Sequence, residues 1–391
     1  MKNIVYADNA ATTPLSDHAL SSMLPFFQER YGNPSAVHEL GRDAHSEVEI
    51  ARRAVGAAIG ANINEIYFNS GGTESDNQAI VGACEHKAAK GGHIVSTEVE
   101  HAAVINTLRH LESKGHEVTL LKPDKHGSVG PEGLRAAMRP DTVLVSIMHA
   151  NNVVGTILPI AELCKVAHEG GALFHTDAVQ SVPSIPVNVR ELKVDLLSIS
   201  SHKFHGPKGA GALFVRYGTN LPPLIFGGGQ EKGYRSGTEN VPGIVGMAAA
   251  LTEAKGKMGE NSKRLAAWRD RIIEATLRIR GSALTGDPVK RLPGLASFVF
   301  EGVRESVLIV NRLSDLGICV SSGSACSASS QEAPHVLSAM GVEPALARAS
   351  LRVSLSAQNT EADVEAIIEA LPKVIDSLRA DRNTLYGLPM G

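Results

Sequence analysis

Short apolar runs alternate with stretches of helical periodicity between about residue 48 and residue 215. The runs have no regular polar position, which is typical of strands covered on both faces of a parallel sheet. In one intervening stretch Val48, Ala51, Val55 and Ile59 are spaced as on one helix face. The pattern predicts an α/β fold, a mostly parallel sheet with helices on both faces. Buried strands are predicted at 66–68, 94–96, 118–121, 143–148, 173–175 and 196–199, and further helices at about 73–90 and 160–168.

Past residue 216 the pattern changes to loops, a long helical stretch and fewer strands. The helical stretch follows Pro242 and continues into an amphipathic stripe over 265–279. A closing helix begins at Thr360, with Asp363 three residues later as in a capping box. We expect a large domain over residues 15–260 and a smaller α+β domain over 1–14 and 261–391, with strands at 296–300 and 352–355.

The chain carries 38 basic and 41 acidic side chains over 391 residues, a net charge of −3. This balance gives no electrostatic reason to expect nucleic acid or a membrane as a partner. The 43% hydrophobic and 20% charged residues are those of an ordinary globular protein. No uncharged apolar stretch is long enough to span a bilayer, and the first residues reach a charge before a signal sequence could form. We therefore expect a cytoplasmic protein.

The four cysteines are too few and too scattered for a disulfide framework, and none forms a Cys-x-x-Cys pair. Cys84, Cys164 and Cys319 lie in apolar patterns and are interpreted as packing residues. Cys326 lies among glycine, serine and alanine, so it is expected on an exposed, mobile loop. An exposed thiol is a liability unless its reactivity is used, which makes Cys326 a candidate for chemistry.

A glycine-rich turn at residues 70–75 (Ser-Gly-Gly-Thr-Glu-Ser) follows a predicted strand and opens a predicted helix. Glycines allow the backbone to approach a ligand closely, and the first N–H groups of a helix attract an anion. Because the lysine of a nucleotide-binding P-loop is missing, the turn suits a small phosphorylated ligand. A simple helix cap is the alternative interpretation.

Two further polar side chains follow buried strands at the edge where α/β sheets bind ligands. Asp177 comes directly after one strand, and a buried carboxylate there needs a positive partner, such as a protonated pyridinium nitrogen. Lys203 follows the next strand, where desolvation would favour a neutral, nucleophilic amine. A capping aspartate and a surface lysine are the alternatives. His202 and His205 have no acidic or thiol ligand beside them, so no metal site is predicted.

A ligand with a phosphate, a ring nitrogen and an aldehyde fits the glycine-rich turn, Asp177 and Lys203 together. That ligand is pyridoxal 5′-phosphate, with Asp177 keeping the ring nitrogen protonated and Lys203 bonded to the aldehyde. In Leu351-Arg352-Val353 the strand alternation turns Arg352 away from the apolar face. There its guanidinium could bind an amino-acid carboxylate, and a surface arginine is the alternative.

Short motifs spread over essentially the whole chain carry a family resemblance. They are Ala-Asp-Asn-Ala-Ala-Thr-Thr (7–13), Tyr-Gly-Asn-Pro-Ser (31–35), Ser-Gly-Gly-Thr-Glu-Ser-Asp-Asn (70–77), Glu-His (100–101), His-Ala-Asn-Asn (149–152), Asp-Ala-Val-Gln (177–180), Ser-Ser-His-Lys (200–203), Arg-Ser-Gly-Thr (235–238) and Ser-Ser-Gly-Ser-Ala-Cys (321–326). The chain resembles the cysteine desulfurases of the iron–sulfur-cluster and nitrogen-fixation subgroup, within the class-V aminotransferase group of fold-type-I enzymes that use pyridoxal 5′-phosphate. The last motif resembles the long cysteine loop of that subgroup, which is expected on the smaller domain.

The resemblance implies roles for individual residues around the cofactor. Lys203 is implied to hold the cofactor covalently, and His101 to stack on its ring and assist proton transfer. Asn152, Asp177 and Gln180 are implied to hold the ring. The residues implied to bind the cofactor phosphate are Gly72, Thr73, Ser200, His202 and, from the other subunit of a homodimer, Thr238.

By the same resemblance Asn33 and Arg352 bind the substrate carboxylate, and Cys326 takes up sulfur. The implied activity removes sulfur from L-cysteine, giving L-alanine and a persulfide on Cys326 for delivery to an iron–sulfur scaffold or another sulfur-acceptor protein. Val153 and Leu158 stand where the family usually has Glu and Gln, so the local hydrogen bonding must differ. The alternatives are a selenocysteine lyase, a class-V aminotransferase and a non-catalytic, partner-binding paralogue.

Overall fold

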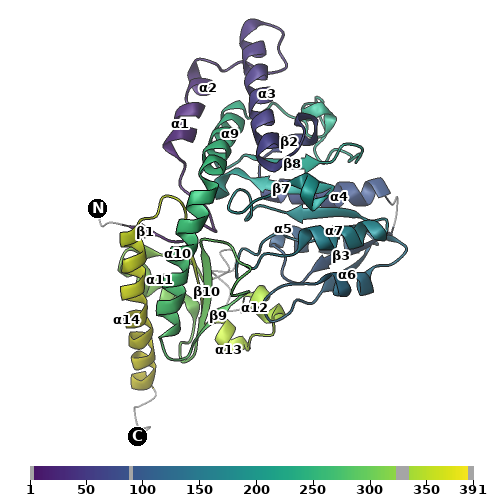
Figure 1. Cartoon of the computed structure of the whole chain (residues 1–391). Helices are drawn as coiled ribbons and strands as arrows, with labels where there is room; N and C mark the ends of the chain where they lie inside the picture. Colours follow the sequence, from purple (N-terminus) through teal and green to yellow (C-terminus); the bar gives the residue numbers. More distant parts are fainter. Residues whose placement is uncertain (1–3, 88–90, 323–333, 386–391) are drawn as a thin grey trace.

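The computed structural model describes residues 4–87, 91–322 and 334–385. Its largest sheet consists of β2 Ile66–Asn69, β3 His93–Thr97, β4 Glu117–Leu121, β5 Thr142–Ser146, β6 Leu173–Asp177, β7 Leu196–Ser200 and β8 Gly211–Val215. The strands lie in the order β2-β8-β7-β6-β5-β3-β4 (Figure 1). From β7 to β4 neighbouring strands are parallel, whereas β8 is antiparallel to both β2 and β7. This confirms the predicted mostly parallel sheet.

Helices cover both faces of this sheet. They include α3 Glu39–Ile59, α4 Gly72–Lys87, α5 Ala102–Ser113, α6 Pro131–Ala137, α7 Ile160–Glu169, α8 Val189–Leu192 and α9 Val241–Gly256. Ile94 packs in a hydrophobic cluster with α4 and α5, and its neighbour Val95 packs in another with α3, α7 and α9. Successive side chains of a strand point to opposite faces, so the two clusters lie on opposite sides of the sheet. The helices predicted around residue 48 and over about 73–90 and 160–168 are confirmed as α3, α4 and α7.

The prediction of a buried strand at 118–121 is wrong in its burial. β4 lies at the edge of the sheet, pairs with β3, and has Leu121 as its one buried residue. Leu120 is 39% exposed. The position of a strand in a sheet depends on the order of all the strands, which a local apolar pattern does not contain.

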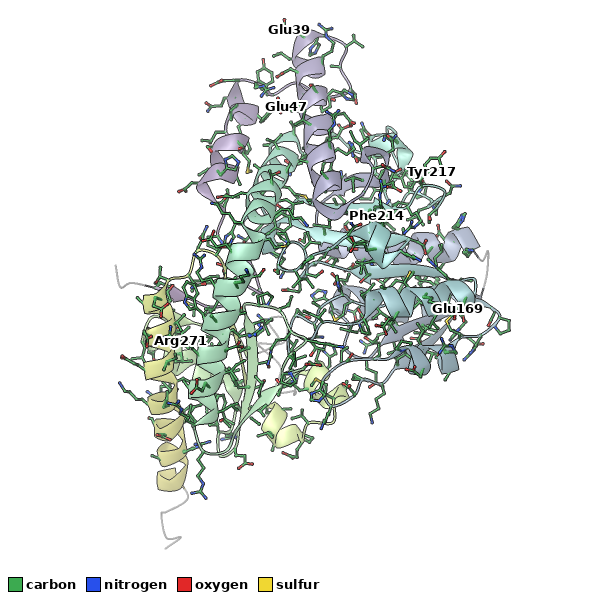
Figure 2. All side chains as sticks on the ribbon, viewed as in Figure 1. Glu39, Glu47, Glu169, Phe214, Tyr217 and Arg271 are labelled. Carbon is green, nitrogen blue, oxygen red and sulfur yellow. The ribbon has the colours of Figure 1, made fainter. Side chains whose placement is uncertain are left out.

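A second group of elements lies below the large sheet in Figure 1. It comprises an antiparallel sheet of β9 Ser282–Thr285, β10 Leu295–Phe300 and β12 Ser350–Ser354, the parallel pair β1 Val5–Tyr6 and β11 Ile318–Cys319, and the helices α10 Met258–Leu277, α11 Ser306–Asp315 and α14 Glu361–Leu385. These elements share one hydrophobic cluster. On its outer side Arg271 of α10 forms ion pairs with Glu361 and Glu365 of α14 (Figure 2).

In the second half of the chain one helix begins where the sequence predicts it, and one predicted helical stretch forms two separate helices. The closing helix α14 begins as predicted, because the Thr360 N–H donates to Asp363 Oδ2 at 2.9 Å. The stretch after Pro242 forms two helices, since α9 ends at Gly256 and α10 begins at Met258. The predicted domain boundary near residue 260 falls in the first turn of α10, and the division into domains stays a prediction.

Shorter helices complete the described chain. They are α1 Asp17–Met23, α2 Pro25–Gln28, α12 His335–Ala339, α13 Pro344–Ala347, and the 3₁₀ turns η1 Ile63–Glu65, η2 Ser201–Lys203 and η3 Glu231–Gly233. In the part of the chain that the structure describes, the helices are too short or too polar to cross a bilayer.

Candidate active site

A cavity of about 380 Å³ lies where β6 and β7 end and α4 and α5 begin. Ligands of α/β sheets bind at the carboxyl ends of parallel strands, so the cavity has the expected position. The chain brings ten of the predicted site residues into its wall: Gly72, Thr73, His101, Asn152, Asp177, Gln180, Ser200, His202, Lys203 and Arg352.

The glycine-rich turn forms the end of the cavity at the start of α4. Gly71 has φ +143°, a conformation that favours glycine, and a Cβ on Gly72 would lie 2.8 Å from Val179 Cγ2. Glycine therefore keeps this space open in front of the first N–H groups of a 16-residue helix. Ser200 and His202 line the same corner. Their positions fit a site for a phosphate.

His202 is fixed in this corner by the N-terminal segment. Its Nδ1 lies 3.0 Å from Thr12 Oγ1, and its carbonyl accepts from the backbone N–H of Thr13. Burial, helped by the charges of Lys203 and Lys208, lowers the pKa of His202 to about 4. The imidazole is therefore neutral near pH 7.

Asp177 is the last residue of β6 and is 7% exposed. Its Oδ1 accepts from the Val179 N–H at 2.8 Å. Burial raises the pKa of Asp177, while that hydrogen bond and the charges of His101 and Lys203 oppose the rise. A cation placed against this carboxylate would complete its ionisation.

A second buried acid, Asp76, lies beside Asp177 and was not predicted from the sequence. It comes from α4 and lines the cavity. Its Oδ1 lies 3.6 Å from His175 Nε2, and His175 Nδ1 contacts Ser146 Oγ at 2.9 Å. Burial, and then the charge of Asp177, holds the pKa of Asp76 well above its usual value. Because Asp177 has the Val179 N–H donor and the charge of Lys203 nearby, the negative charge of the pair lies on Asp177.

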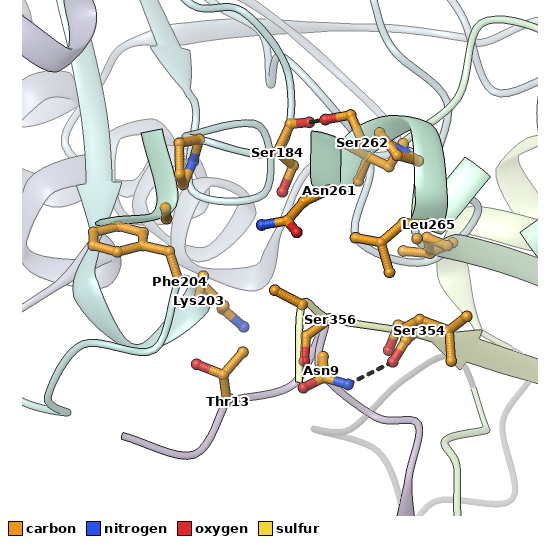
Figure 3. A pocket seen from close by; sticks show the side chains of 18 of the residues that line it. Asn9, Thr13, Ser184, Lys203, Phe204, Asn261, Ser262, Leu265, Ser354 and Ser356 are labelled. Atoms are coloured by element: carbon orange, nitrogen blue, oxygen red, sulfur yellow. Dashed lines mark hydrogen bonds between the residues drawn. The ribbon is translucent and has the colours of Figure 1, made fainter. Parts of the chain in front are cut away.

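The amine of Lys203 lies at the boundary between this cavity and a second one. Lys203 Nζ donates to the carbonyls of Ala10 and Ala11 at 2.7 and 2.8 Å. Gln180 Nε2 donates to the same Ala10 carbonyl at 2.9 Å. The second cavity, of about 110 Å³, shares Lys203, Ala10 and Gln180 with the first (Figure 3).

His101 precedes α5, and its ring is oriented by the helix. Its Nδ1 accepts from the Ala103 N–H at 3.1 Å. Burial lowers the pKa of His101; Lys203 and His335 lower it further, and Asp177 opposes them. His335, which was not predicted, reaches the cavity wall from α12 and donates through Nε2 to the Glu100 carbonyl at 3.0 Å.

Arg352 is 1% exposed, which excludes the alternative of a surface arginine. Its Nη2 donates to Asp8 Oδ1 at 2.7 Å and its Nη1 to the Asn152 carbonyl at 2.8 Å. Its Nε is buried without a hydrogen-bond partner in the structure. Nη1 and Nη2 each carry a second N–H beyond these two bonds, so the guanidinium in the cavity wall keeps unused donors. Asp8 is a second residue that the sequence analysis did not assign.

Among the described residues, two predicted site residues are not brought into this wall. Asn33 is exposed and its Oδ1 accepts from the Ser35 N–H at 2.9 Å. Thr238 is exposed on the loop between η3 and α9. Cys326 lies outside the described residues. Val153 does line the cavity, and it packs in a cluster with Val336 and Leu337 of α12.

Asp76, Asp8 and His335 were not predicted, and the sequence marks these three residues to different degrees. Asp76 belongs to the motif at 70–77 and lies one helical turn after Gly72, so helical geometry alone could have turned it toward the cavity. Asp8 belongs to the motif at 7–13, but its contact with Arg352 spans 344 positions. His335 stands in no motif, and no local signal marks it.

Comparison with known proteins adds an independent line of evidence. The aminotransferase class-V family matches residues 5–367. A cysteine desulfurase IscS of Dictyoglomus turgidum is 49% identical over 381 residues, which cover 97% of this chain and 96% of that protein. A solved structure titled NifS-like protein superposes with a TM-score of 0.90 at 38% identity, covering 96% of this chain and 100% of the other. Another, titled SspA in complex with cysteine, has a TM-score of 0.79 at 37% identity and covers 90% of this chain and 98% of the other.

Proposed function

The chain belongs to the class-V aminotransferase family, and from that membership and its cavity we propose that it is a cysteine desulfurase dependent on pyridoxal 5′-phosphate. It takes sulfur from L-cysteine and releases L-alanine. Its relatives include a cysteine desulfurase IscS and a NifS-like protein, and one similar structure is a complex with cysteine. Iron–sulfur cluster assembly is the proposed destination of the sulfur.

The residues of the cavity fit pyridoxal 5′-phosphate. The open space before Gly72 suits the phosphate, the buried carboxylate of Asp177 suits a protonated ring nitrogen, and the amine of Lys203 suits the aldehyde. Thr73, Ser200 and His202 would add donors to the phosphate, and Asn152 and Gln180 would hold the ring. When bound, this cofactor supplies an electron sink for charge that forms on the substrate α-carbon.

The side chains around the cofactor move and hold protons. Lys203 Nζ would hold the cofactor and afterwards carry the proton of the substrate α-carbon. Asp177 would keep the proton on the ring nitrogen, because its carboxylate is buried and keeps its negative charge beside neutral Asp76. His101, whose lowered pKa leaves it neutral near pH 7, would accept or return a proton beside Lys203.

The substrate is bound through its carboxylate and loses its sulfur to a thiol. The unused N–H groups of Arg352 would bind the carboxylate of L-cysteine. Asn33 stays a predicted carboxylate ligand, since it does not line this cavity in the single chain. The Cys326 thiolate would attack the substrate sulfur, forming an S–S bond while the C–S bond breaks. The substrate β-carbon keeps the electron pair of the broken C–S bond and takes a proton. The product that leaves is L-alanine. Cys326 retains a persulfide for a sulfur-acceptor protein.

We further propose a homodimer that works in the cytoplasm. Thr238 of one subunit would complete the phosphate site of the other, which accounts for its exposure in the single chain. Large apolar side chains that a partner could cover are exposed near the N-terminus and on the loop before η3, among them Phe27, Tyr31 and Phe226. A thiol that must stay reduced to take up sulfur suits a reducing compartment.

One observation carries the proposed function: the cavity joins the amine of Lys203, the buried acid Asp177, the arginine Arg352 and a helix N-terminus. The test is incubation of the cofactor-loaded protein with L-cysteine, followed by mass measurement of the peptide that holds Cys326. We expect a gain of one sulfur atom and an equal amount of L-alanine. The Cys326→Ser variant should bind the cofactor and form no persulfide. Consumption of a keto acid would favour an aminotransferase, and selenide release from selenocysteine alone would favour a lyase.

A further inference from the structure

Residues 8–13, here called the N-terminal strap, connect β12 with the turn that carries Lys203. At one end the Asn9 N–H donates to the Ser354 carbonyl at 3.1 Å, and the Ala10 N–H to Ser354 Oγ at 2.9 Å. At the other end the Thr13 N–H donates to the His202 carbonyl at 2.9 Å. Figure 3 shows Thr13 beside Lys203 on one side of the second cavity, with Asn9 bonded to Ser354 on the other.

The strap holds both cationic side chains of the active-site cavity. The carbonyls of Ala10 and Ala11 accept from Lys203, and the carboxylate of Asp8 accepts from Arg352. Asp8 is an acid placed directly on the arginine that the proposed function assigns to the substrate carboxylate. The carboxylate of Asp8 therefore already accepts a hydrogen bond from one nitrogen, Nη2, of the Arg352 guanidinium.

The backbone that carries the Asp8 carboxylate is fixed beside Arg352. The backbone of Asp8 forms a bridge with Ser354, and its carbonyl accepts from the Tyr6 hydroxyl at 3.2 Å. Displacing this backbone would also disturb Ala10, two residues on, whose carbonyl accepts from Lys203. Nη1 and Nη2 of Arg352 each keep one N–H beyond their bonds to the Asn152 carbonyl and Asp8, so a second carboxylate can be added without displacing the first.

We propose that Asp8 determines how strongly the site binds amino-acid carboxylates, by sharing Arg352 with them. This inference rests on the proposed function, because it takes Arg352 as the carboxylate site. A ligand carboxylate on the remaining Nη N–H groups faces one positive guanidinium and one negative Asp8. Like charges a few ångströms apart in a partly buried site repel, so Asp8 weakens ligand binding. Neutralising Asp8 while keeping its hydrogen-bond acceptor should strengthen it.

Weak carboxylate binding has a use in the proposed reaction. L-Cysteine and L-alanine carry the same carboxylate and the same amine. Arg352 therefore cannot bind the substrate carboxylate tightly without also binding the product carboxylate tightly. A resident acid at Arg352 lowers the affinity for both. Asp8 would thereby allow L-alanine to leave.

The test compares L-alanine with ethylamine, which is alanine without its carboxylate. Both are titrated into the cofactor-loaded wild type and the Asp8→Asn variant, and binding is read from the absorbance of the cofactor. We expect Asp8→Asn to bind L-alanine about three- to tenfold more tightly and ethylamine within about twofold of wild type. In turnover the KM for L-cysteine should fall by a similar factor. Asp8→Glu, which keeps the charge, should stay near wild type.

A matched control is Asp376→Asn, which neutralises an exposed acid paired with Arg379 on α14; neither residue lines the cavity, so both ligands should be unchanged. Unchanged or weaker L-alanine binding by Asp8→Asn overturns the proposal, and so does equal tightening of L-alanine and ethylamine. If Asp8→Asn does not fold, Asp8→Ser removes the same charge and decides the question. The alanine measurement needs no turnover, so it stands apart from the persulfide test of the proposed function.

Discussion

Three carboxyl groups are buried near the active-site cavity, and burial raises the pKa of each. Asp177, Asp76 and Glu100 are each less than 9% exposed. Asp177 has partners that favour its charge, whereas Asp76 Oδ1 and Glu100 Oε2 are buried without a hydrogen-bond partner. Burial disfavours the charged form of a carboxyl when one of its oxygens has no such partner. Glu100 is the clearest case, because its pKa is raised to about 8.

Glu100 should make stability depend on pH. Burial raises its pKa, and the hydrogen bonds from the Met148 N–H and the Thr97 hydroxyl only partly oppose it. The folded chain therefore holds a proton that the unfolded chain releases above about pH 4.5. The stabilising contribution is complete below that pH and is lost as pH rises toward about 8, by about 1.4 kcal/mol for each pH unit at most.

Glu100→Gln removes this dependence, because the amide oxygen can accept the same two hydrogen bonds. We expect the free energy of unfolding of the variant to equal that of wild type near pH 5 within about 1 kcal/mol, and to exceed it by a few kcal/mol at pH 8.5. Urea unfolding at pH 5, 6.5 and 8.5 measures the difference. The exposed acid Glu112 supplies the control variant Glu112→Gln, which should show no such trend. A constant difference across the pH range would contradict the assignment.

At the scale of elements, the glycine-rich turn depends on a glycine in a neighbouring strand. Gly211 is the first residue of β8, and a Cβ there would lie 2.5 Å from Gly71 Cα and 2.7 Å from the Ile199 carbonyl oxygen. Both neighbours are backbone atoms and cannot turn aside. Gly211→Ala should therefore push the turn away from the sheet, cost about 1–3 kcal/mol of stability and weaken cofactor binding.

Unfolding in urea and titration of the apoprotein with pyridoxal 5′-phosphate measure the two effects of Gly211→Ala. The control is Gly259→Ala in α10, where a Cβ meets nothing within 4 Å. That helical substitution should stabilise by up to about 1 kcal/mol and leave cofactor binding alone. Wild-type cofactor affinity in Gly211→Ala would show that the turn does not depend on this packing.

A buried ion pair fixes the loop that leads to Thr238. Arg52 of α3 donates through Nη1 and Nη2 to both carboxylate oxygens of Glu231, at 2.6 and 2.8 Å. Glu231 also accepts from the Phe68 N–H, and it has φ +49°, an unfavourable value for a residue other than glycine. The ion pair thus holds η3 against β2 in a conformation that the loop would not keep alone.

Arg52→Met leaves the Glu231 charge buried and alone, so it should cost about 3–5 kcal/mol. The double variant Arg52→Met with Glu231→Gln removes both charges and keeps an acceptor for the Phe68 N–H. It should regain part of that loss. Urea unfolding of the two single variants and the double variant measures the coupling. A double variant no more stable than Arg52→Met would mean that the pair does not act as a unit.

The elements also show which parts of the fold a sequence can predict. Strand interiors and capped helix starts are local, and Thr360 with Asp363 was a sufficient signal for the start of α14. The exposure of β4 and the break between α9 and α10 depend on neighbours that are distant along the chain. The same distinction holds in the site. Asp177 and Lys203 follow strands that could be predicted, whereas Asp8 reaches Arg352 because its backbone bridges to Ser354 of β12, far along the chain.

At the scale of the whole molecule, one predicted site residue, Thr238, lies outside the active-site cavity of its own chain. Thr238 was assigned to the cofactor phosphate but does not line the cavity that contains Gly72, Ser200 and His202. It is exposed, as are Phe27 and Phe226. A dimer in which Thr238 reaches the cavity of the partner would account for both facts. Whether the residue acts within its own chain or across subunits can be decided genetically.

The experiment combines Lys203→Ala in one subunit with Thr238→Ala in the other, purified as a heterodimer with two affinity tags. If Thr238 acts across subunits, the site with an intact Lys203 also receives an intact Thr238, because that residue comes from the Lys203→Ala chain. The heterodimer should then show about half the activity and half the tight cofactor binding of wild type, while each homodimer is impaired. If Thr238 acts within its own chain, the only site with a lysine lacks the threonine, and the heterodimer should be no better than the Thr238→Ala homodimer. That result would remove Thr238 from the partner's site and with it the structural reason for a dimer.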